Sequence, residues 1–316
     1  MAYYVAIDIG GTAVKHGVAD AEGRFLEKGG FGTGLPAAGI PRLLDLVTAQ
    51  IRHYQACYDI AGVGVDTAGV VDAERGTILM EARNFPGYEG TPLRQYLEDA
   101  CGIPCAVEND VNAAGLGEYW LGAGQGASSL VCLTVGTGIG GCVLLDGKLL
   151  HGCCGSAGEV GYMRLHGSGA DLESSAAVPW LLRTVTEQKG MPAGSLTGRD
   201  VFALAQAGDT VAAEAIGTLV HRLVVAIENI CCVVNPELVL LGGGIMGQHD
   251  YLRPLLEAEK KRIFPPYLEP RTRLDFARLG NDAGMAGALR NLLDRMEGKR
   301  NDFCEGCNVI RHMLQR

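Results

Sequence analysis

Residues 5–23 read VAIDIGGTAVKHGVADAEG, a glycine turn between two apolar, β-branched runs. The turn is typical of a phosphate-binding hairpin, because paired glycines let the backbone approach an anion and direct successive N–H groups at it. Next to Gly10 and Gly11, the side chain of Thr12 provides a hydroxyl that can bind an anion. Asp8 provides a carboxylate suited to Mg²⁺. The residues after the turn continue as a strand rather than a helix, which excludes a P-loop and a Rossmann turn here.

The composition is that of a globular protein with two domains. The chain has 316 residues, 47% of them hydrophobic, and a formal net charge of -9. This charge argues against nucleic acid or an anionic membrane as a partner, so a bound phosphate must be held by local N–H groups and a metal. We expect that no run approaches the roughly 18 apolar residues of a membrane span, and no signal-like stretch opens the chain, so we expect a cytoplasmic protein.

Eleven cysteines raise the possibility of a disulfide framework. They are scattered in apolar surroundings, as at Cys132, Cys142, Cys231 and Cys232, so we expect reduced thiols in the core instead. Cys304 and Cys307 have the spacing of half a zinc knuckle, but no second pair lies close in the sequence. We therefore expect no metal site in this tail-like segment.

Strand-like and helical stretches alternate along the chain, which is α/β order. From Ser129 a second unit begins, and residues 130–152 (LVCLTVGTGIGGCVLLDGKLLHG) again read strand, glycine turn, strand, polar turn, strand. The chain is therefore interpreted as a duplication, with two glycine loops facing each other across a cleft that fits ATP phosphates. The expected strands span 4–7, 14–19, 62–65 and 104–107, and the expected helices span 40–56 and 92–101.

The spacing G-x-G-x-x-G occurs twice. Gly136, Gly138 and Gly141 match it, but a strand follows them, so the helix that would receive a pyrophosphate is missing. Residues 242–247 match it between a strand and a helix. That segment lies late in the chain and lacks a clear following βαβ unit with a ribose-binding acid. We interpret it as a loop on the adenosine side of the nucleotide rather than as a nicotinamide dinucleotide site.

A polar cluster, VENDVNAAGLGE at residues 107–118, follows an expected strand. Ligands of α/β sheets gather at the carboxyl ends of strands, so Asn109 and Asp110 are candidates to contact a substrate. The alternative is an Asx turn in which Asp110 or Asn112 caps the following helix. From the residues alone, the two interpretations stand equal.

Seven motifs together resemble the ROK family, a group of sugar kinases, related repressors and open reading frames with an actin-like, hexokinase-type fold. The motifs are DIGGTAVK from residue 8, TAGVVD from 67, ENDVNAA from 108, GTGIGG from 136, GEVGY from 158, LGGGI from 241 and GNDAGMAGA from 280. They cover nearly the whole chain in order, which is more specific than any glycine motif alone. The resemblance implies a duplicated, ribonuclease H-like ATPase fold of the α/β class.

The resemblance also implies the domain organisation. Two domains are expected to close on a sugar: a smaller one from residues 1–117 and 288–316, and a larger one from residues 118–287. The helix around Ala283 to Arg295 would complete the smaller domain. A homodimer is expected from the resemblance as well.

The resemblance assigns roles to individual residues. Asp110 is implied to be the base that takes the proton from the attacking sugar hydroxyl, and Asn109 to bind a neighbouring hydroxyl. The sugar contacts implied beside them are Asn84, Glu159, Tyr162 and Glu173, although Asn84 before a Phe-Pro pair is alternatively a turn residue. Mg²⁺ is implied to be held by Asp8 through water. The implied ATP contacts are Asp8, Gly10, Gly11, Thr12, Lys15, Gly136, Thr137, Gly138, Gly242, Gly243 and Gly244.

The chain departs from the family pattern at its zinc motif. Many members have histidine after GE-x-G and a C-x-C-x4-C cluster downstream, whereas this chain has Tyr162 and the run GSGADLESS at 167–175. We therefore predict no structural zinc. Zinc-free relatives phosphorylate several sugars, so the expected activity is a hexose-type 6-kinase favouring N-acetylmannosamine or glucose, with a β-glucoside as alternative.

Two other classes compete with a kinase. A sugar-sensing ROK regulator would carry a winged helix-turn-helix before the sugar domain, and a hairpin starting at Asp8 is expected to leave no room for one. An actin-like filament ATPase would use the same hairpins, but the ENDVNAA and GEVGY motifs argue against it. We therefore expect an enzyme whose partners are a small-molecule sugar and Mg-ATP.

Overall fold

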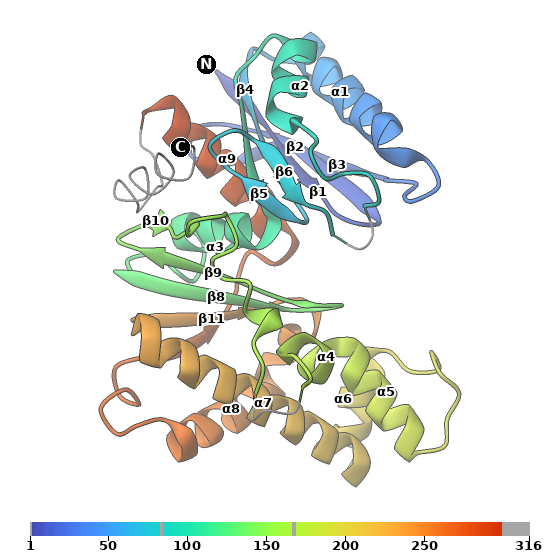
Figure 1. The fold of residues 1–316 in the computed structure, drawn as a ribbon, viewed down its shortest axis with the longest axis vertical. Helices are drawn as coiled ribbons and strands as arrows, with labels where there is room; N and C mark the ends of the chain where they lie inside the picture. The colour runs from blue at the N-terminus through green and yellow to red at the C-terminus, as the bar shows by residue number, and fades with distance from the viewer. Residues whose placement is uncertain (1, 83–84, 166–168, 299–316) are drawn as a thin grey trace, which may run out of the picture. The chain divides into compact units, whose positions relative to one another are not determined.

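The computed structural model describes residues 2–82, 85–165 and 169–298 (Figure 1). The chain forms two compact units. One contains residues 1–126, 142–157 and 281–316, and the other contains residues 127–141 and 158–280. This division into compact units does not test the domain limits that we expect from the sequence, so those limits stay a prediction.

The first unit is built on a five-stranded sheet with the strand order β3-β2-β1-β4-β7. β1, β2 and β3 form antiparallel pairs, and β4 and β7 run parallel to β1. The strands of this sheet are β1 (Tyr3–Ile9), β2 (Ala13–Ala19), β3 (Phe25–Gly32), β4 (Ile60–Thr67) and β7 (Cys105–Asn109). β5 (Val70–Asp72) and β6 (Thr77–Met80) pair separately.

Side chains of β1 alternate between two cores, because successive residues of a strand point to opposite faces. Val5 and Ile7 belong to the larger core, which also contains the buried side of α1. Ala6 lies on the other face and packs with Met285 and Leu289 of α9. The helices of this unit are α1 (Gly39–Cys57), α2 (Leu93–Cys101), α3 (Asp110–Leu121) and α9 (Ala283–Met296). Even-numbered residues of β1 therefore face α9.

The contact between α3 and α9 is very close. A β-carbon added to Gly287 of α9 would overlap the backbone carbonyl of Ala113 in α3. A β-carbon added to Gly64 of β4 would likewise overlap the backbone of Ala288. Glycine at these positions lets α9 lie directly against both the sheet and α3, and Figure 1 shows α9 beside them in red.

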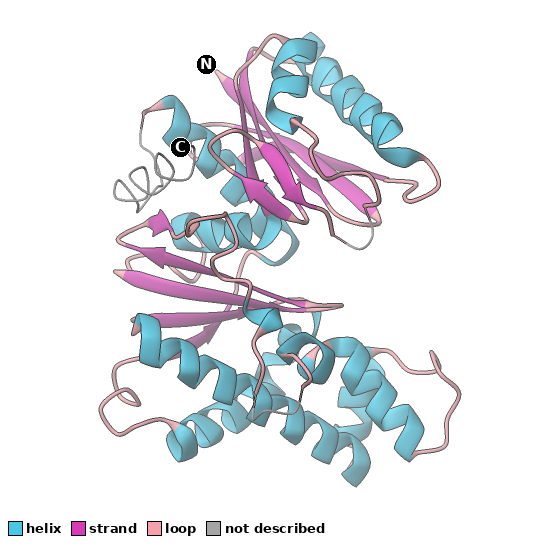
Figure 2. Ribbon diagram, viewed as in Figure 1, coloured by secondary structure: helices cyan, strands magenta, loops and turns pink. Residues whose placement is uncertain are grey.

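The second sheet repeats the topology of the first. Its order is β10-β9-β8-β11-β12, with an antiparallel hairpin on one side and the parallel strands β8, β11 and β12 on the other. The strands are β8 (Ser129–Val135), β9 (Ile139–Leu145), β10 (Lys148–Leu149), β11 (Leu238–Gly242) and β12 (Arg273–Phe276). The expected α/β duplication is thereby confirmed. Figure 2 shows the strands of both sheets in magenta.

The helices of the second unit pack around α7. They are α4 (Leu172–Ala176), α5 (Val178–Gln188), α6 (Gly198–Gln206), α7 (Thr210–Val234) and α8 (His249–Ile263), with short 3-10 turns η1 (Val160–Tyr162), η2 (Gly244–Gln248) and η3 (Gly280–Asp282) between elements. α7 is long and apolar enough to cross a membrane by length and composition alone, with a mean hydropathy of 1.6. This corrects the expectation that no run approaches such a span. Packing against α4, α5, α6 and α8 explains its apolar character.

Candidate active site

The first glycine turn joins β1 to β2, as predicted. The Gly10 N–H donates to the carbonyl of Ala13 at 3.0 Å, which closes the turn. The Thr33 hydroxyl supports it by donating to the carbonyl of Gly11 at 3.1 Å. Thr12 is exposed at the tip. The hydrogen bond from Thr33 thus fixes the turn, while the tip of the turn faces solvent. This arrangement suits the expected contact with phosphate.

A row of charged side chains crosses the first sheet next to this turn. In the strand register Asp8 lies opposite Lys15 on one side and Asp66 on the other, and Asp66 lies opposite Glu108. Neighbouring residues in register point to the same face, which here is the face of α9. Lys15 pairs with Asp8 at 2.7 Å. Three carboxyl groups and one ammonium group therefore follow one another across four adjacent strands.

Asp66 is the member of this row that sequence reasoning did not identify. Its side chain is fully buried, and within the described part of the chain neither carboxyl oxygen has a hydrogen-bond partner. A β-carbon added to Gly284 in α9 would lie 3.1 Å from both oxygens, so the helix leaves no room beside them. Burial raises the pKa of Asp66 well above its usual range, and the carboxylates of Asp8 and Asp110 raise it further, while Lys15 opposes them.

Asp66→Asn should raise the free energy of unfolding at pH 7 by roughly 1–3 kcal/mol, because it removes a carboxyl group whose charged form is disfavoured by burial and by neighbouring carboxylates. Because the folded-state pKa of Asp66 is raised, its cost to stability is absent below the unfolded pKa of about 3.9 and grows as the pH rises. The gain should therefore shrink as the pH falls toward 4. Urea unfolding between pH 4 and 8 measures it. Asn at the exposed Asp250 is the control, and equal gains in both variants would contradict the prediction.

Asn109 and Asp110 lie where β7 ends and α3 begins. The Asn109 side-chain oxygen accepts from the N–H groups of Val111 (2.9 Å) and Asn112 (3.0 Å), so Asn109 is the N-cap. This corrects the alternative that Asp110 or Asn112 caps the helix, because the extended residue before the first helical turn is Asn109. The Asn109 amide nitrogen donates to the carbonyl of Gly69 at 2.9 Å and to Asp110 Oδ1 at 3.0 Å.

The Asp110 carboxylate is held by its own helix. Its Oδ1 also accepts from the N–H of Val111 at 2.9 Å. A negative charge is stabilised in the first turn of a helix by the partial positive charge of the unpaired N–H groups. The Asn109 amide and the start of α3 therefore fix the position of the Asp110 carboxylate.

His151 is a second residue that sequence reasoning did not identify. It follows β10, and its Nε2 lies 2.8 Å from Oε2 of the buried Glu108. Glu108 directly precedes Asn109 and Asp110. The only sequence signal is a histidine two residues after a short strand, which by itself indicates nothing.

The second glycine turn, between β8 and β9, is supported by Glu173. The Gly136 N–H donates to the carbonyl of Gly138 at 2.9 Å, and the Ile139 N–H donates to Glu173 Oε2 at 3.1 Å. A β-carbon on Gly138 would overlap the Glu173 carboxylate. Glu173, predicted as a sugar contact, therefore lies directly behind this turn, which also contains Thr137.

Glu159 lies near Glu173 in the second unit. Burial raises the pKa of Glu159, and the carboxylate of Glu173 adds to the effect. Tyr162, at the end of η1, is 65% exposed. The structure thus brings the two predicted glutamates together and leaves the tyrosine ring at the surface.

The predicted adenosine loop begins at the end of β11. Gly242 lies opposite Thr134 of β8, so this loop and the second glycine turn leave neighbouring parallel strands at the same edge. Gly243 has a φ of 97°, and a β-carbon there would overlap the backbone of Val135. Gly244 opens η2. One expectation is wrong: β11, α8 and β12 form a parallel βαβ unit after all.

The predictions about Asn84, the cysteines and zinc concern residues outside the site described above. Asn84, Cys304 and Cys307 lie outside the described residues. The nine cysteines that the structure describes are free thiols, but the expectation of core positions is wrong for four of them, which are exposed: Cys57, Cys153, Cys154 and Cys232. Among residues 2–82, 85–165 and 169–298, no three His, Cys, Asp or Glu side chains gather closely enough to hold a metal ion. The absence of structural zinc stays a prediction.

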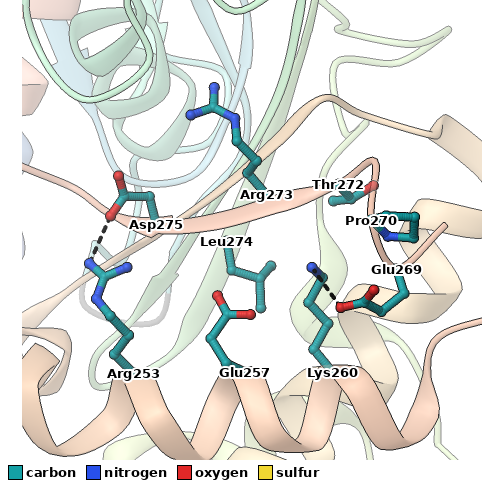
Figure 3. Close-up of a pocket in the computed structure, with 9 residues that line it drawn as sticks. All are labelled: Arg253, Glu257, Lys260, Glu269, Pro270, Thr272, Arg273, Leu274 and Asp275. Carbon is teal, nitrogen blue, oxygen red and sulfur yellow. Dashed lines mark hydrogen bonds and ion pairs between the residues drawn. The ribbon is translucent and has the colours of Figure 1, made fainter.

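A pocket of about 330 Å³ lies between α8 and β12 in the second unit (Figure 3). Arg253 reaches Asp275 at 2.9 Å, and the buried Lys260 lies 3.7 Å from Glu269. Four of the lining charges thus form two ion pairs with each other, while Arg273 pairs with Glu237 outside the lining. Its lining contains none of the residues predicted to bind sugar or nucleotide.

Comparison with known proteins shows the relationships of the chain. The model of the ROK family matches residues 4–294. The chain is 32% identical over 314 residues to the glucokinase of Halalkalibacterium halodurans, covering 90% of this chain and 93% of that one. It is 33% identical over 298 residues to the β-glucoside kinase of Listeria monocytogenes, covering 91% and 96%. A ROK family glucokinase from Streptomyces griseus, solved with glucose and AMPPNP, matches with a TM-score of 0.79 at 28% identity, covering 92% and 99%.

Proposed function

Because this chain belongs to the ROK family, we propose that it is an ATP-dependent sugar kinase with Asp110 as its general base. The acceptor is the O6 hydroxyl of a hexose or an N-acetylhexosamine. Relatives named glucokinase and β-glucoside kinase support sugar phosphorylation. The Streptomyces griseus structure, which holds glucose and AMPPNP, supports a sugar and a nucleotide as the two ligands.

One observation carries the assignment of the base. In the register of the first sheet, Ile9 lies opposite Thr67, and Thr67 lies opposite Asn109. The phosphate hairpin begins one residue after Ile9, and Asp110 comes one residue after Asn109. The glycine turn and the carboxylate therefore leave the sheet at the same edge. A base beside a phosphate-binding turn is what transfer from ATP to a hydroxyl requires.

In the proposed reaction the sugar hydroxyl gives its proton to the Asp110 carboxylate while its oxygen attacks the γ-phosphorus of ATP. The bond from that phosphorus to the bridging oxygen breaks, and ADP leaves. The sugar is held by Asn109, Glu159 and Glu173, with Tyr162 at the margin. Gly10 to Thr12 and the loops at 136–138 and 242–244 hold the nucleotide.

Asp8 fits the role of a magnesium anchor. Mg²⁺ prefers carboxylate, water and phosphate oxygens, and the carboxyl groups of Asp8 and Asp66 lie side by side in the charged row. Asp8 would hold the ion through water, with Lys15 adjoining it. When bound, Mg²⁺ neutralises charge on the β- and γ-phosphates.

A coupled ADP-release assay should identify the substrate. The sugars to compare are glucose, N-acetylmannosamine, N-acetylglucosamine, mannose, fructose and cellobiose. We expect glucose or N-acetylmannosamine to give the highest kcat/KM, with turnover well above the rate without sugar. Cellobiose as the best substrate would identify a β-glucoside kinase. Sugar binding without ADP release from folded protein would favour a sugar-sensing regulator and overturn the kinase proposal.

A further inference from the structure

Glu108 is a fully buried carboxylate whose hydrogen bonds surround the proposed base. Its Oε1 accepts from the backbone N–H of Asn109 and from the Asn112 amide, both at 2.9 Å, and its Oε2 lies 2.8 Å from His151 Nε2. A buried carboxylate is costly unless both oxygens are paired. A carboxylate oxygen accepts hydrogen bonds, so we assign the donor role in this bond to His151 Nε2.

These contacts lead directly to Asp110. Glu108 binds the residue before Asp110 and the residue two positions after it. Asn109 in turn donates to Asp110 Oδ1 at 3.0 Å. A chain of hydrogen bonds therefore runs from His151 through Glu108 and Asn109 to the carboxylate that takes the proton. Each bond that involves a carboxylate is of the stronger, charge-assisted kind.

The segment that carries His151 is itself fixed within the first unit. The carbonyl of His151 accepts from the Ala157 N–H at 3.2 Å, so residues 151–157 close on themselves. A β-carbon on Gly155 would lie 2.8 Å from the carbonyl oxygen of Val71 in β5, so the loop lies directly on that strand. The histidine is 14% exposed at its side chain. A loop anchored at this point gives Glu108 a rigid partner rather than a mobile one.

We propose that His151 is a positioning residue for phosphoryl transfer. By holding Glu108, it fixes the backbone of Asn109 and so aims the Asp110 carboxylate at the sugar hydroxyl. His151 itself touches neither the sugar nor the phosphate. This inference rests on the proposed role of Asp110 as base, and it predicts a loss in the rate of the chemical step rather than in the binding of either substrate.

The test compares two substitutions of the same histidine. His151→Phe keeps the ring volume and removes the N–H, whereas His151→Gln keeps an amide N–H that reaches Glu108. We expect His151→Phe to lower kcat roughly 10- to 100-fold, with the KM for ATP and for sugar changed less than about threefold, on the scale of a lost charge-assisted hydrogen bond. His151→Gln should return kcat to within about fivefold of the original. His249→Phe, at an exposed histidine of the second unit, is the matched control with unchanged kcat.

The remaining outcomes separate this inference from the proposed function. If Asp110→Asn is inactive while folded His151→Phe keeps its kcat, the positioning role is overturned and the base stands. If Asp110→Asn is active, both the role of Asp110 as base and the positioning role of His151 are overturned. A rise in KM without a fall in kcat, or an equal loss in the Phe and Gln variants, also overturns it. Should His151→Phe not fold, His151→Asn takes its place, because its shorter amide falls short of Glu108.

A double-mutant cycle gives an independent answer. Glu108→Gln should lower kcat, and adding His151→Phe to it should cause little further loss, because both changes break the same chain of bonds. Losses that simply multiply would show that the two residues act separately and would overturn the proposal.

Discussion

Asp110→Asn should lower kcat for sugar phosphorylation by roughly 10²- to 10⁴-fold, the range that a positioned base contributes. Asparagine keeps the shape of the side chain and can still accept from the N–H of Val111, so the start of α3 is preserved. It cannot take a proton from the sugar. Steady-state kinetics with the preferred sugar measures kcat, and calorimetric titration with ATP should find unchanged binding.

The matched control for this change is Asp99→Asn. Asp99 lies in α2 and accepts a hydrogen bond from Gln95 at the surface, away from the charged row. This variant should keep its turnover. Near-normal turnover in Asp110→Asn would remove Asp110 from the mechanism, and loss of ATP binding together with turnover would indicate a structural role instead.

Gly287→Ala should have the largest effect on stability, with a loss of more than about 3 kcal/mol or no folded protein. The added methyl group would overlap the backbone carbonyl of Ala113, and a carbonyl inside a helix cannot turn away as a side chain can. Overpacking a core usually costs about 1–3 kcal/mol, and a backbone clash lies at or beyond the upper end of that range. The midpoint of urea unfolding measures the loss.

Gly217→Ala offers the opposite outcome from the same chemical change. Gly217 lies inside α7, and among the described residues no atom lies within 4 Å of a β-carbon placed there, apart from its chain neighbours and the backbone of its own helix. Alanine is the better helix former, so this variant should gain about 0.5–1 kcal/mol. Equal effects in the two variants would contradict the account of the contact between α3 and α9.

Much of the fold follows from local patterns in the sequence. β1, β2 and β4 contain three of the predicted strands, and β7 overlaps the fourth from residue 105, because their apolar, β-branched runs have no competing interpretation. β3 (FLEKGGFG) was not predicted, because an edge strand exposed over most of its length needs no apolar alternation. β12 has only four residues, so the βαβ unit at β11 was missed.

The site could be predicted only in part, for a similar reason. Asp8 and Asp110 adjoin glycine and Asx motifs that are visible locally. Asp66 becomes significant only once β1 and β4 pair in parallel and place it beside Asp8. His151 lies 43 residues from Glu108, and no local pattern connects the two. Contacts of this kind are set by strand register and loop packing, which a single sequence does not reveal.

The position of α9 in the chain sets an order of assembly during biosynthesis. α9 contacts β1, β4, β7 and α3, yet the ribosome makes it only after residues 158–280 of the other unit. Until α9 emerges, the nascent first sheet presents its uncovered face, with Asp8 and Asp66 side by side, to the surrounding water. The second unit can fold in that interval, since protein domains generally fold as units during synthesis. The first unit, and with it the proposed site, is therefore completed only at the end of synthesis, when α9 packs against the sheet and α3.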